Sequence, residues 1–313
     1  MEKSKSLFFA GLLQVADPKI WIASSIPMLS GAVVAWCFGK NIKPLSFLWF
    51  LLAMIVVFLV EIAKNALNEV VDFQSGVDPG IDEEHRTPFS GGKKSIVQGK
   101  LDLTQCLKIA IVCFLLAGMI GFFLAVLVEP RIFWIGLAGF LLAILYSLPP
   151  FKLCYRGLGE LAVGIAFGPV TVMGMYVLIE GRTDWLPLLV SLPIAFLIIN
   201  VLWINQFPDY EIDKACGKKN LVVRLGKKKS IWGYAALFAL AYISLIPIAW
   251  YAHNPVWLCA LLTLPISVKA VKNCVLNYNN ISKLMASNAA TVQIYQLFGL
   301  SFVLSALLDG LVF

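Results

Sequence analysis

Long apolar segments, separated by short polar loops, dominate the pattern of hydrophobic and polar positions along this chain. Each segment is about 20 residues long, which is the length that an α-helix needs to cross roughly 30 Å of hydrocarbon. The pattern predicts nine transmembrane helices, with two longer polar loops after the second and the sixth. We place the helices over residues 20–39, 45–67, 103–128, 132–148, 158–179, 185–206, 231–251, 255–275 and 289–309.

The composition excludes a soluble domain of any size. Hydrophobic residues make up 60% of the chain and charged residues 14%, against about 45–50% and about 25% in soluble domains. We therefore expect an all-α membrane protein in which residues 1–313 form one integral membrane domain. Near the N-terminus, Lys3 and Lys5 precede a short apolar run, residues 7–13, without a small-residue cleavage site. This pattern favours an interfacial helix over a signal peptide.

The net charge of +7 reflects membrane orientation rather than nucleic-acid binding, because Lys and Arg are confined to a few loops and helix ends. With a cytoplasmic N-terminus, 21 of the 25 Lys and Arg residues lie on the cytoplasmic side, and the others are Lys40, Lys43, Arg131 and Arg182. The positive-inside rule thus predicts a multi-pass protein of the cytoplasmic membrane with its C-terminus outside. Both longer polar loops, 68–102 and 207–230, are then cytoplasmic.

The first of these loops begins with polar residues at helical spacing. If the second predicted helix continues past residue 67, then Asn65, Asn68 and Asp72 lie on one face. Gly76 provides a helix-ending turn that can fold Asp78 back toward the same point.

The second loop repeats this arrangement. Asn205, Asp209 and Asp213 are four residues apart, which predicts one face of a continuing helix. Acidic side chains at a helix C-terminus oppose the macrodipole and therefore require a nearby cation. Clusters of oxygen ligands without His or Cys suit Mg²⁺, which carboxylates bridge to substrate phosphates.

These residues resemble the motifs of the UbiA superfamily of intramembrane prenyltransferases. The first motif, N-D-x-x-D-x-x-x-(G-x-)D, is similar to Asn68, Asp72, Gly76 and Asp78, with Glu69 where Asp is usual. The second, D-x-x-x-D-x-x-x-G-K, is matched by Asp209, Asp213, Gly217 and Lys218. Three further stretches resemble family segments over residues 146–152, 157–160 and 220–226.

The resemblance implies that Asp72, Asp78, Asp209 and Asp213 hold Mg²⁺ on the diphosphate of an isoprenoid donor. It places Asp72 and Asp209 among the catalytic groups, together with Tyr146, whose ring could face the allylic cation. Asn68 and Asn205 would orient metal or phosphate oxygens. The basic candidates for binding the remaining phosphate oxygens are Arg86, Lys93, Lys94, Lys152 and Lys218.

The form of the two motifs looks like that of family members that prenylate 1,4-dihydroxy-2-naphthoate on the way to menaquinone. Two features depart from this pattern. Quinone-pathway members often carry Arg at the position of Pro208, and the stretch 86–95 differs from the usual first loop of the family. A hydroxybenzoate, or a non-aromatic acceptor such as a glycerol ether or carotenoid, therefore stays open. A secondary transporter is the rival from another class, although the acidic motifs lie at one membrane surface instead of the midplane.

Overall fold

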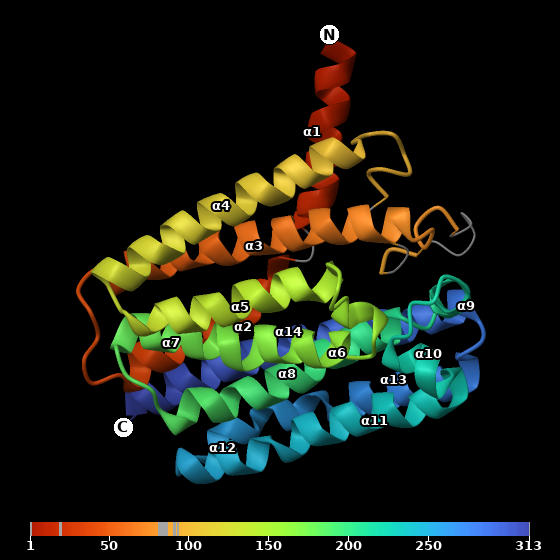
Figure 1. Cartoon of the computed structure of the whole chain (residues 1–313). Helices are drawn as coiled ribbons and strands as arrows, with labels where there is room; N and C mark the ends of the chain where they lie inside the picture. The colour runs from red at the N-terminus through yellow and green to blue at the C-terminus, as the bar shows by residue number, and fades with distance from the viewer. Residues whose placement is uncertain (1, 19–20, 81–86, 90–91, 93, 313) are drawn as a thin grey trace.

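The computed structural model describes residues 2–18, 21–80, 87–89, 92 and 94–312 of the chain. In this part the regular secondary structure is all helical, without strands (Figure 1). The helices before the second motif are α1 Glu2–Ala16, α2 Trp21–Phe38, α3 Ser46–Gln74, α4 Leu103–Leu127, α5 Arg131–Ser147, η3 Leu153–Tyr155, α6 Gly159–Ile165, η4 Ala166–Val170, α7 Thr171–Glu180 and α8 Trp185–Asn205. The later ones are α9 Tyr210–Ala215, α10 Leu221–Leu225, α11 Lys227–Ile243, α12 Leu245–Tyr251, η5 Pro255–Thr263, α13 Leu264–Asn277 and α14 Ile281–Val312.

The helices agree closely with the predicted set of membrane spans. Eight helical segments of the described chain are at least 18 residues long and apolar enough to cross a bilayer. Three of them combine shorter elements, namely α6 with η4 and α7, α11 with α12, and η5 with α13. The shorter apolar helix α5 has 17 residues, about the minimum for a span, and completes the nine predicted segments.

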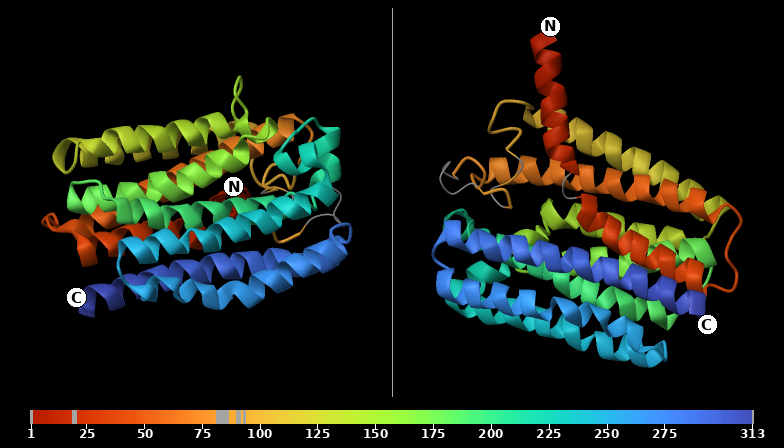
Figure 2. Two further views of the ribbon diagram at one scale, coloured as in Figure 1. Left: turned by 90° about the horizontal axis from the view of Figure 1, so that it is seen from below. Right: turned by 180° about the vertical axis from the view of Figure 1, so that it is seen from behind.

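The long helices run side by side in one bundle (Figures 1 and 2). Helix α3 packs along α4, while α2 packs against α7 and α14, and α8 against α11 and α14. The N-terminal helix α1 crosses α3 instead of running along it (Figure 1). This is the orientation expected of the interfacial helix that the sequence predicts.

Two features of the chain put the polar loops at the same end of the bundle. Helix α3 continues beyond its apolar part to Gln74. Helix α8 ends at Asn205, where Pro208 follows and cannot donate a backbone hydrogen bond to a further turn. The segments after α3 and α8 therefore emerge together, opposite the C-terminus (Figure 2).

Candidate active site

The first motif is built on the end of α3, as predicted. Gly76 has a φ of +83°, which a residue with a Cβ adopts only at a cost. After this turn, the backbone N–H of Asp78 donates to the carbonyl oxygen of Asp72 at 3.2 Å. Both carboxyl side chains are buried, Asp72 with 3% and Asp78 with 3% of its surface exposed.

The second motif differs from the prediction that Asn205, Asp209 and Asp213 share one face of a continuous helix. That prediction was wrong, because the chain turns between α8 and α9 around Pro208. Asp209 instead immediately precedes α9, and Asp213 lies within it. This turn leaves Asn205 on the long helix and moves the two aspartates to a separate short helix.

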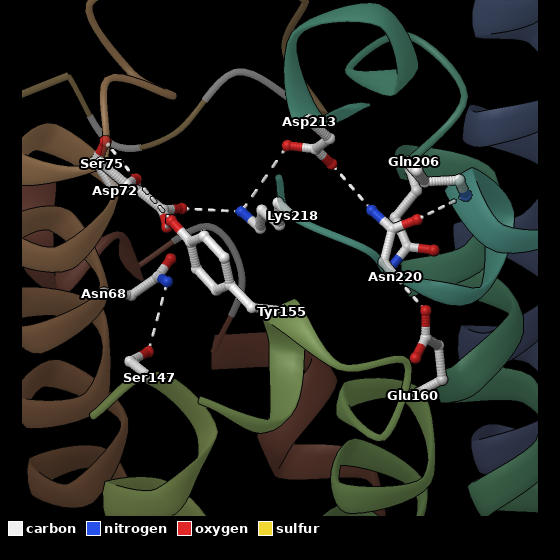
Figure 3. A network of polar contacts seen from close by, with 11 residues as sticks. Asn68, Asp72, Ser75, Ser147, Tyr155, Glu160, Gln206, Asp213, Lys218 and Asn220 are labelled. Atoms are coloured by element: carbon white, nitrogen blue, oxygen red, sulfur yellow. Dashed lines mark hydrogen bonds and ion pairs between the residues drawn. The ribbon is translucent and has the colours of Figure 1, made fainter. Parts of the chain in front are cut away.

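Lys218 joins the two motifs (Figure 3). Its Nζ lies 2.8 Å from Asp72 Oδ2 and 3.9 Å from Asp213 Oδ1. Asn220 Nδ2 donates to the other oxygen of Asp213 at 2.8 Å. Burial would lower the pKa of Lys218, but the charges of Asp72 and Asp213 outweigh it and hold the pKa well above its usual value. Lys218 is therefore a cation that neutralises two carboxylates from distant parts of the chain.

Tyr155 is a site residue that sequence reasoning missed. Its hydroxyl donates to Asp72 Oδ1 at 2.7 Å and lies 2.5 Å from Ser75 Oγ (Figure 3). Burial, followed by the charge of Asp72, raises the pKa of Tyr155, so the phenol stays protonated and can donate. No local pattern marks this residue, although it lies three positions after the candidate Lys152.

The carboxylates fit a divalent cation. Burial raises the pKa of Asp78 to about 8, and the charges of Asp72 and Glu69 contribute to this shift. Burial also raises the pKa of Asp213 to about 7, and the charge of Asp209 adds to the effect. Among the described residues, no hydrogen-bond donor contacts the buried oxygens Asp78 Oδ1 and Asp213 Oδ1. Gly92 packs against Asp78. A Cβ at position 92 would lie only 2.7 Å from Asp78 Cγ, so a larger residue would collide with the carboxyl group. These buried oxygens repel one another, and a cation would relieve the repulsion.

No three acidic, His or Cys side chains of the described residues converge into a ready metal cage. This suits Mg²⁺ better than a metal that needs a full set of protein ligands. Mg²⁺ usually binds through one or two carboxylates, and its other ligands are waters and substrate phosphates.

Four other predicted site residues make the following contacts. Asn68 Nδ2 donates to Ser147 Oγ at 3.3 Å, and Asn205 Oδ1 accepts from Asn288 Nδ2 at 2.8 Å. Lys152 Nζ lies 5.0 Å from the centre of the Tyr155 ring. Tyr146 lines an apolar cavity.

The described part of the loop after the first motif packs against residues of that motif. The candidate Lys94 begins a helical turn in this loop, in which Gln98 N donates to Lys94 O at 2.9 Å. The candidates Arg86 and Lys93 lie outside the described residues. Glu69 holds this turn in place, since its Oε1 accepts from Ser95 Oγ at 3.1 Å and from Ile96 N at 3.0 Å. The glutamate that replaces a motif aspartate thus anchors the covering loop.

Glu160 is a second residue whose role the sequence did not indicate. Its Oε1 accepts from Gln206 Nε2 at 2.9 Å and from Leu221 N at 2.8 Å (Figure 3). With 1% of its surface exposed, it fastens α6 to both ends of the second-motif segment. The position of Asp209 and Asp213 relative to α8 depends on this contact.

An apolar cavity of about 400 Å³ is lined by α3, α4, α5, the segment from α6 to α7, and Ser24 of α2. Several lining positions on α4 and α5 are glycines. A Cβ at Gly118, Gly121 or Gly136 would meet no atom within 4 Å. The site therefore combines a buried acidic centre with an extended apolar space.

Comparison with known proteins identifies the family. The sequence profile of the UbiA prenyltransferase family matches residues 24–308. The 1,4-dihydroxy-2-naphthoate octaprenyltransferase of Bacillus subtilis is 29% identical over 289 residues, which cover 92% of this chain and 89% of the relative. The 2-carboxy-1,4-naphthoquinone phytyltransferase of Synechocystis is 28% identical over 271 residues, covering 83% of this chain and 81% of that protein.

Solved structures agree in fold. A UbiA homologue from Aeropyrum pernix superposes with a TM-score of 0.68 at 16% identity, covering 91% of this chain and 98% of that one. A UbiA homologue from Archaeoglobus fulgidus, solved with DMAPP and Mg²⁺, gives a TM-score of 0.65 at 17% identity, with coverage of 93% and 98%. The chain thus belongs to the UbiA prenyltransferase family, and it is an enzyme and not a transporter.

Proposed function

We propose that this enzyme transfers an isoprenoid chain from a prenyl diphosphate to a small aromatic acceptor in a Mg²⁺-dependent reaction. The observation that carries the proposal is the meeting of the two aspartate motifs around Lys218, together with an apolar cavity lined in part by α3, the helix that also carries Asp72. Diphosphate and metal need the polar centre, and the isoprenoid tail needs the cavity. Few other substrates require both.

The residues of the centre have distinct roles in this proposal. Asp72, Asp78, Asp209 and Asp213 hold Mg²⁺, which neutralises charge on the leaving diphosphate while the allylic C–O bond breaks. Lys218 leaves its carboxylates and pairs with phosphate oxygens.

The residues around the centre complete the donor site. Tyr155 keeps Asp72 oriented through its hydrogen bond. Asn68 and Asn205 orient phosphate or metal oxygens, and Lys152 and Lys94 contribute positive charge from the covering loops, with Arg86 and Lys93 as further candidates.

The centre and the cavity together would control the allylic cation. Tyr146 lies in the cavity lining, where the face of its ring can stabilise the cation by about 0.5–2 kcal/mol. The loop that Glu69 anchors would keep water from the cation. An electron-rich ring carbon of the acceptor then supplies the electron pair of the new C–C bond, and its proton is lost to a base.

The proposed acceptor is of the 1,4-dihydroxy-2-naphthoate type. Support comes from the motif forms and from the relatives, since the Bacillus subtilis protein is named for that acceptor. Pro208 excludes an Arg at the position before the second motif, so a carboxylated acceptor must find its cationic partner elsewhere. A non-aromatic lipid acceptor is the alternative that the experiment below must test.

A product assay tests this proposal. Purified protein in nanodiscs, given farnesyl diphosphate and Mg²⁺, should convert 1,4-dihydroxy-2-naphthoate to a prenylated product that mass spectrometry detects. Parallel reactions offer 4-hydroxybenzoate or a glycerol ether. Chelation of Mg²⁺ should stop product formation, because the carboxylates and diphosphate then repel one another. Consumption of the glycerol ether alone would contradict the aromatic acceptor, while activity in full chelation would contradict the metal site.

We also propose that the active-site loops face the cytoplasm, as the distribution of Lys and Arg predicts. In a cysteine-free background, a membrane-impermeant maleimide should label Arg182→Cys in intact cells. The same reagent should label Gln98→Cys and Ala215→Cys only after permeabilisation, since these exposed positions lie at the opposite end of the bundle. Labelling of Gln98→Cys and Ala215→Cys in intact cells would reverse the orientation.

A further inference from the structure

The apolar cavity contains two charged side chains that the diphosphate site does not use. Glu61 and Lys64, both on α3, are the charged residues among the described residues that line it. Glu61 is buried, with 6% of its surface exposed. Ionisable side chains inside a membrane bundle are costly and usually mark a functional site.

Of the α3 residues that line the cavity, these two are the nearest to Asp72 along the helix. At a rise of 1.5 Å per residue, Lys64 lies about 12 Å and Glu61 about 16 Å along α3 from Asp72. Lys64 Nζ is 6.0 Å from the centre of the Tyr146 ring, and Ser147, the next residue, accepts from Asn68. Tyr146 thus connects the charged pair to the place where the allylic carbon would lie.

The carboxylate of Glu61 is held from a second helix. The hydroxyl of Ser24 on α2 donates to Glu61 Oε2, and Ser24 also lines the cavity. The cavity therefore offers an apolar wall, an aromatic ring, an ammonium group and a fixed carboxylate in one region. We call Ser24, Glu61, Lys64 and Tyr146 the acceptor pocket.

We propose that the acceptor binds in this pocket, with an anionic group on Lys64 and a hydroxyl group donating to Glu61. This inference rests on the proposed function and specifies its acceptor as a planar hydroxylated aromatic acid. An acceptor without an anionic group would make no charge-assisted contact with the ammonium of Lys64. A phosphorylated acceptor carries more negative charge, which Glu61 would repel.

The acceptor pocket also supplies a positive charge that could replace the Arg that Pro208 excludes before the second motif. An acceptor carboxylate needs a cationic partner to leave water, because an unpaired buried charge is strongly unfavourable. Lys64 provides this partner from α3. In this arrangement Lys64 binds the acceptor, while Lys218 binds the diphosphate of the donor.

The test compares two acceptors that differ only in the carboxylate, 1,4-dihydroxy-2-naphthoate and 1,4-dihydroxynaphthalene. For the wild type, we expect the carboxylated acceptor to have the lower KM. Lys64→Met should raise the KM of the naphthoate about tenfold or more, because the variant loses a charge-assisted hydrogen bond to the carboxylate. It should leave the KM of the dihydroxynaphthalene and of farnesyl diphosphate within about twofold. Lys64→Arg should retain the carboxylate preference, and Lys108→Met, exposed on α4, is the matched control.

A second readout does not depend on turnover. Binding of the naphthoate to protein without donor, followed by quenching of tryptophan fluorescence, should weaken in Lys64→Met and in Glu61→Gln. An equal loss for both acceptors, or an unchanged preference for the carboxylate in Lys64→Met, would overturn the pocket while leaving prenyl transfer intact. If the wild type prenylates neither compound but consumes a glycerol ether, the proposed aromatic function fails and the pocket fails with it.

Discussion

Asp72→Asn should reduce the rate of prenyl transfer by at least about 100-fold, because it removes one charge from the centre where leaving-group charge develops. The substitution preserves the shape of the side chain, and its oxygen can still accept the hydrogen bond from Tyr155 that Asp72 Oδ1 accepts now at 2.7 Å. The loss therefore reports on charge and not on packing. Product formation from farnesyl diphosphate and the naphthoate measures it at saturating Mg²⁺.

The same loss is expected for Asp209→Asn, because the proposed metal site includes Asp209. Glu211→Gln in the same short helix is the control, since 77% of its side-chain surface is exposed and it lies outside the proposed machinery. Thermal melting and size-exclusion profiles establish that each variant folds. Activity within about threefold of wild type in Asp72→Asn would remove the basis of the metal assignment, since a metal ligand contributes far more than that.

Lys218→Met should impair both catalysis and the stability of the metal-free protein. Without its ammonium, Asp72 and Asp213 lose the cation at 2.8 Å and 3.9 Å. Breaking a buried ion pair from one side costs up to about 3–5 kcal/mol, and less where water reaches the group. We expect a lower melting temperature in chelator and a rate at least about 100-fold lower, since a charge that stabilises the leaving diphosphate is lost.

Magnesium distinguishes these two effects. In Lys218→Met, Mg²⁺ should raise the melting temperature more than it does in the wild type, because the metal replaces the missing cation. The competition between Lys218 and Mg²⁺ for Asp72 should also disappear, so the variant should bind Mg²⁺ more tightly in the absence of diphosphate. Lys229→Met, exposed on α11, serves as control. An unchanged response to Mg²⁺ would contradict the place of Lys218 between the carboxylates.

The arrangement also shows what Glu69 does in place of the motif's usual aspartate. Its longer side chain reaches Ser95 and Ile96 in the covering loop at 3.1 Å and 3.0 Å. Asp72 and Asp78 remain at the centre. Residue 69 thus stays acidic, as is usual in the family, but its carboxylate contacts the loop.

Much of the architecture followed from the sequence by itself. Each membrane helix was predicted to within a few residues except where its polar extension continued, because hydrocarbon thickness sets the length of an apolar span. The first motif was also predictable, since Asn65, Asn68 and Asp72 belong to one uninterrupted helix, α3. Within a single helix, spacing alone determines which side chains share a face.

The sequence was misleading where the helix stopped. The spacing of Asn205, Asp209 and Asp213 suggested one face, but Pro208 ends α8 and begins a turn. A proline in this segment was the signal for that break, because it lacks the N–H of the next helical hydrogen bond.

Only the tertiary structure decided which distant residues form the site. Lys218 and Asp72 are 146 positions apart, and Tyr155 and Asp72 are 83 positions apart. Such contacts depend on how the helices pack. In a membrane helix, lipid-facing and buried positions are both apolar, so the sequence lacks the polar face that shows the packing side of a soluble helix. The roles of Tyr155 and Glu160, and the position of Glu61 and Lys64 in the cavity, were therefore decided by helix packing, which the sequence pattern of an apolar span does not encode.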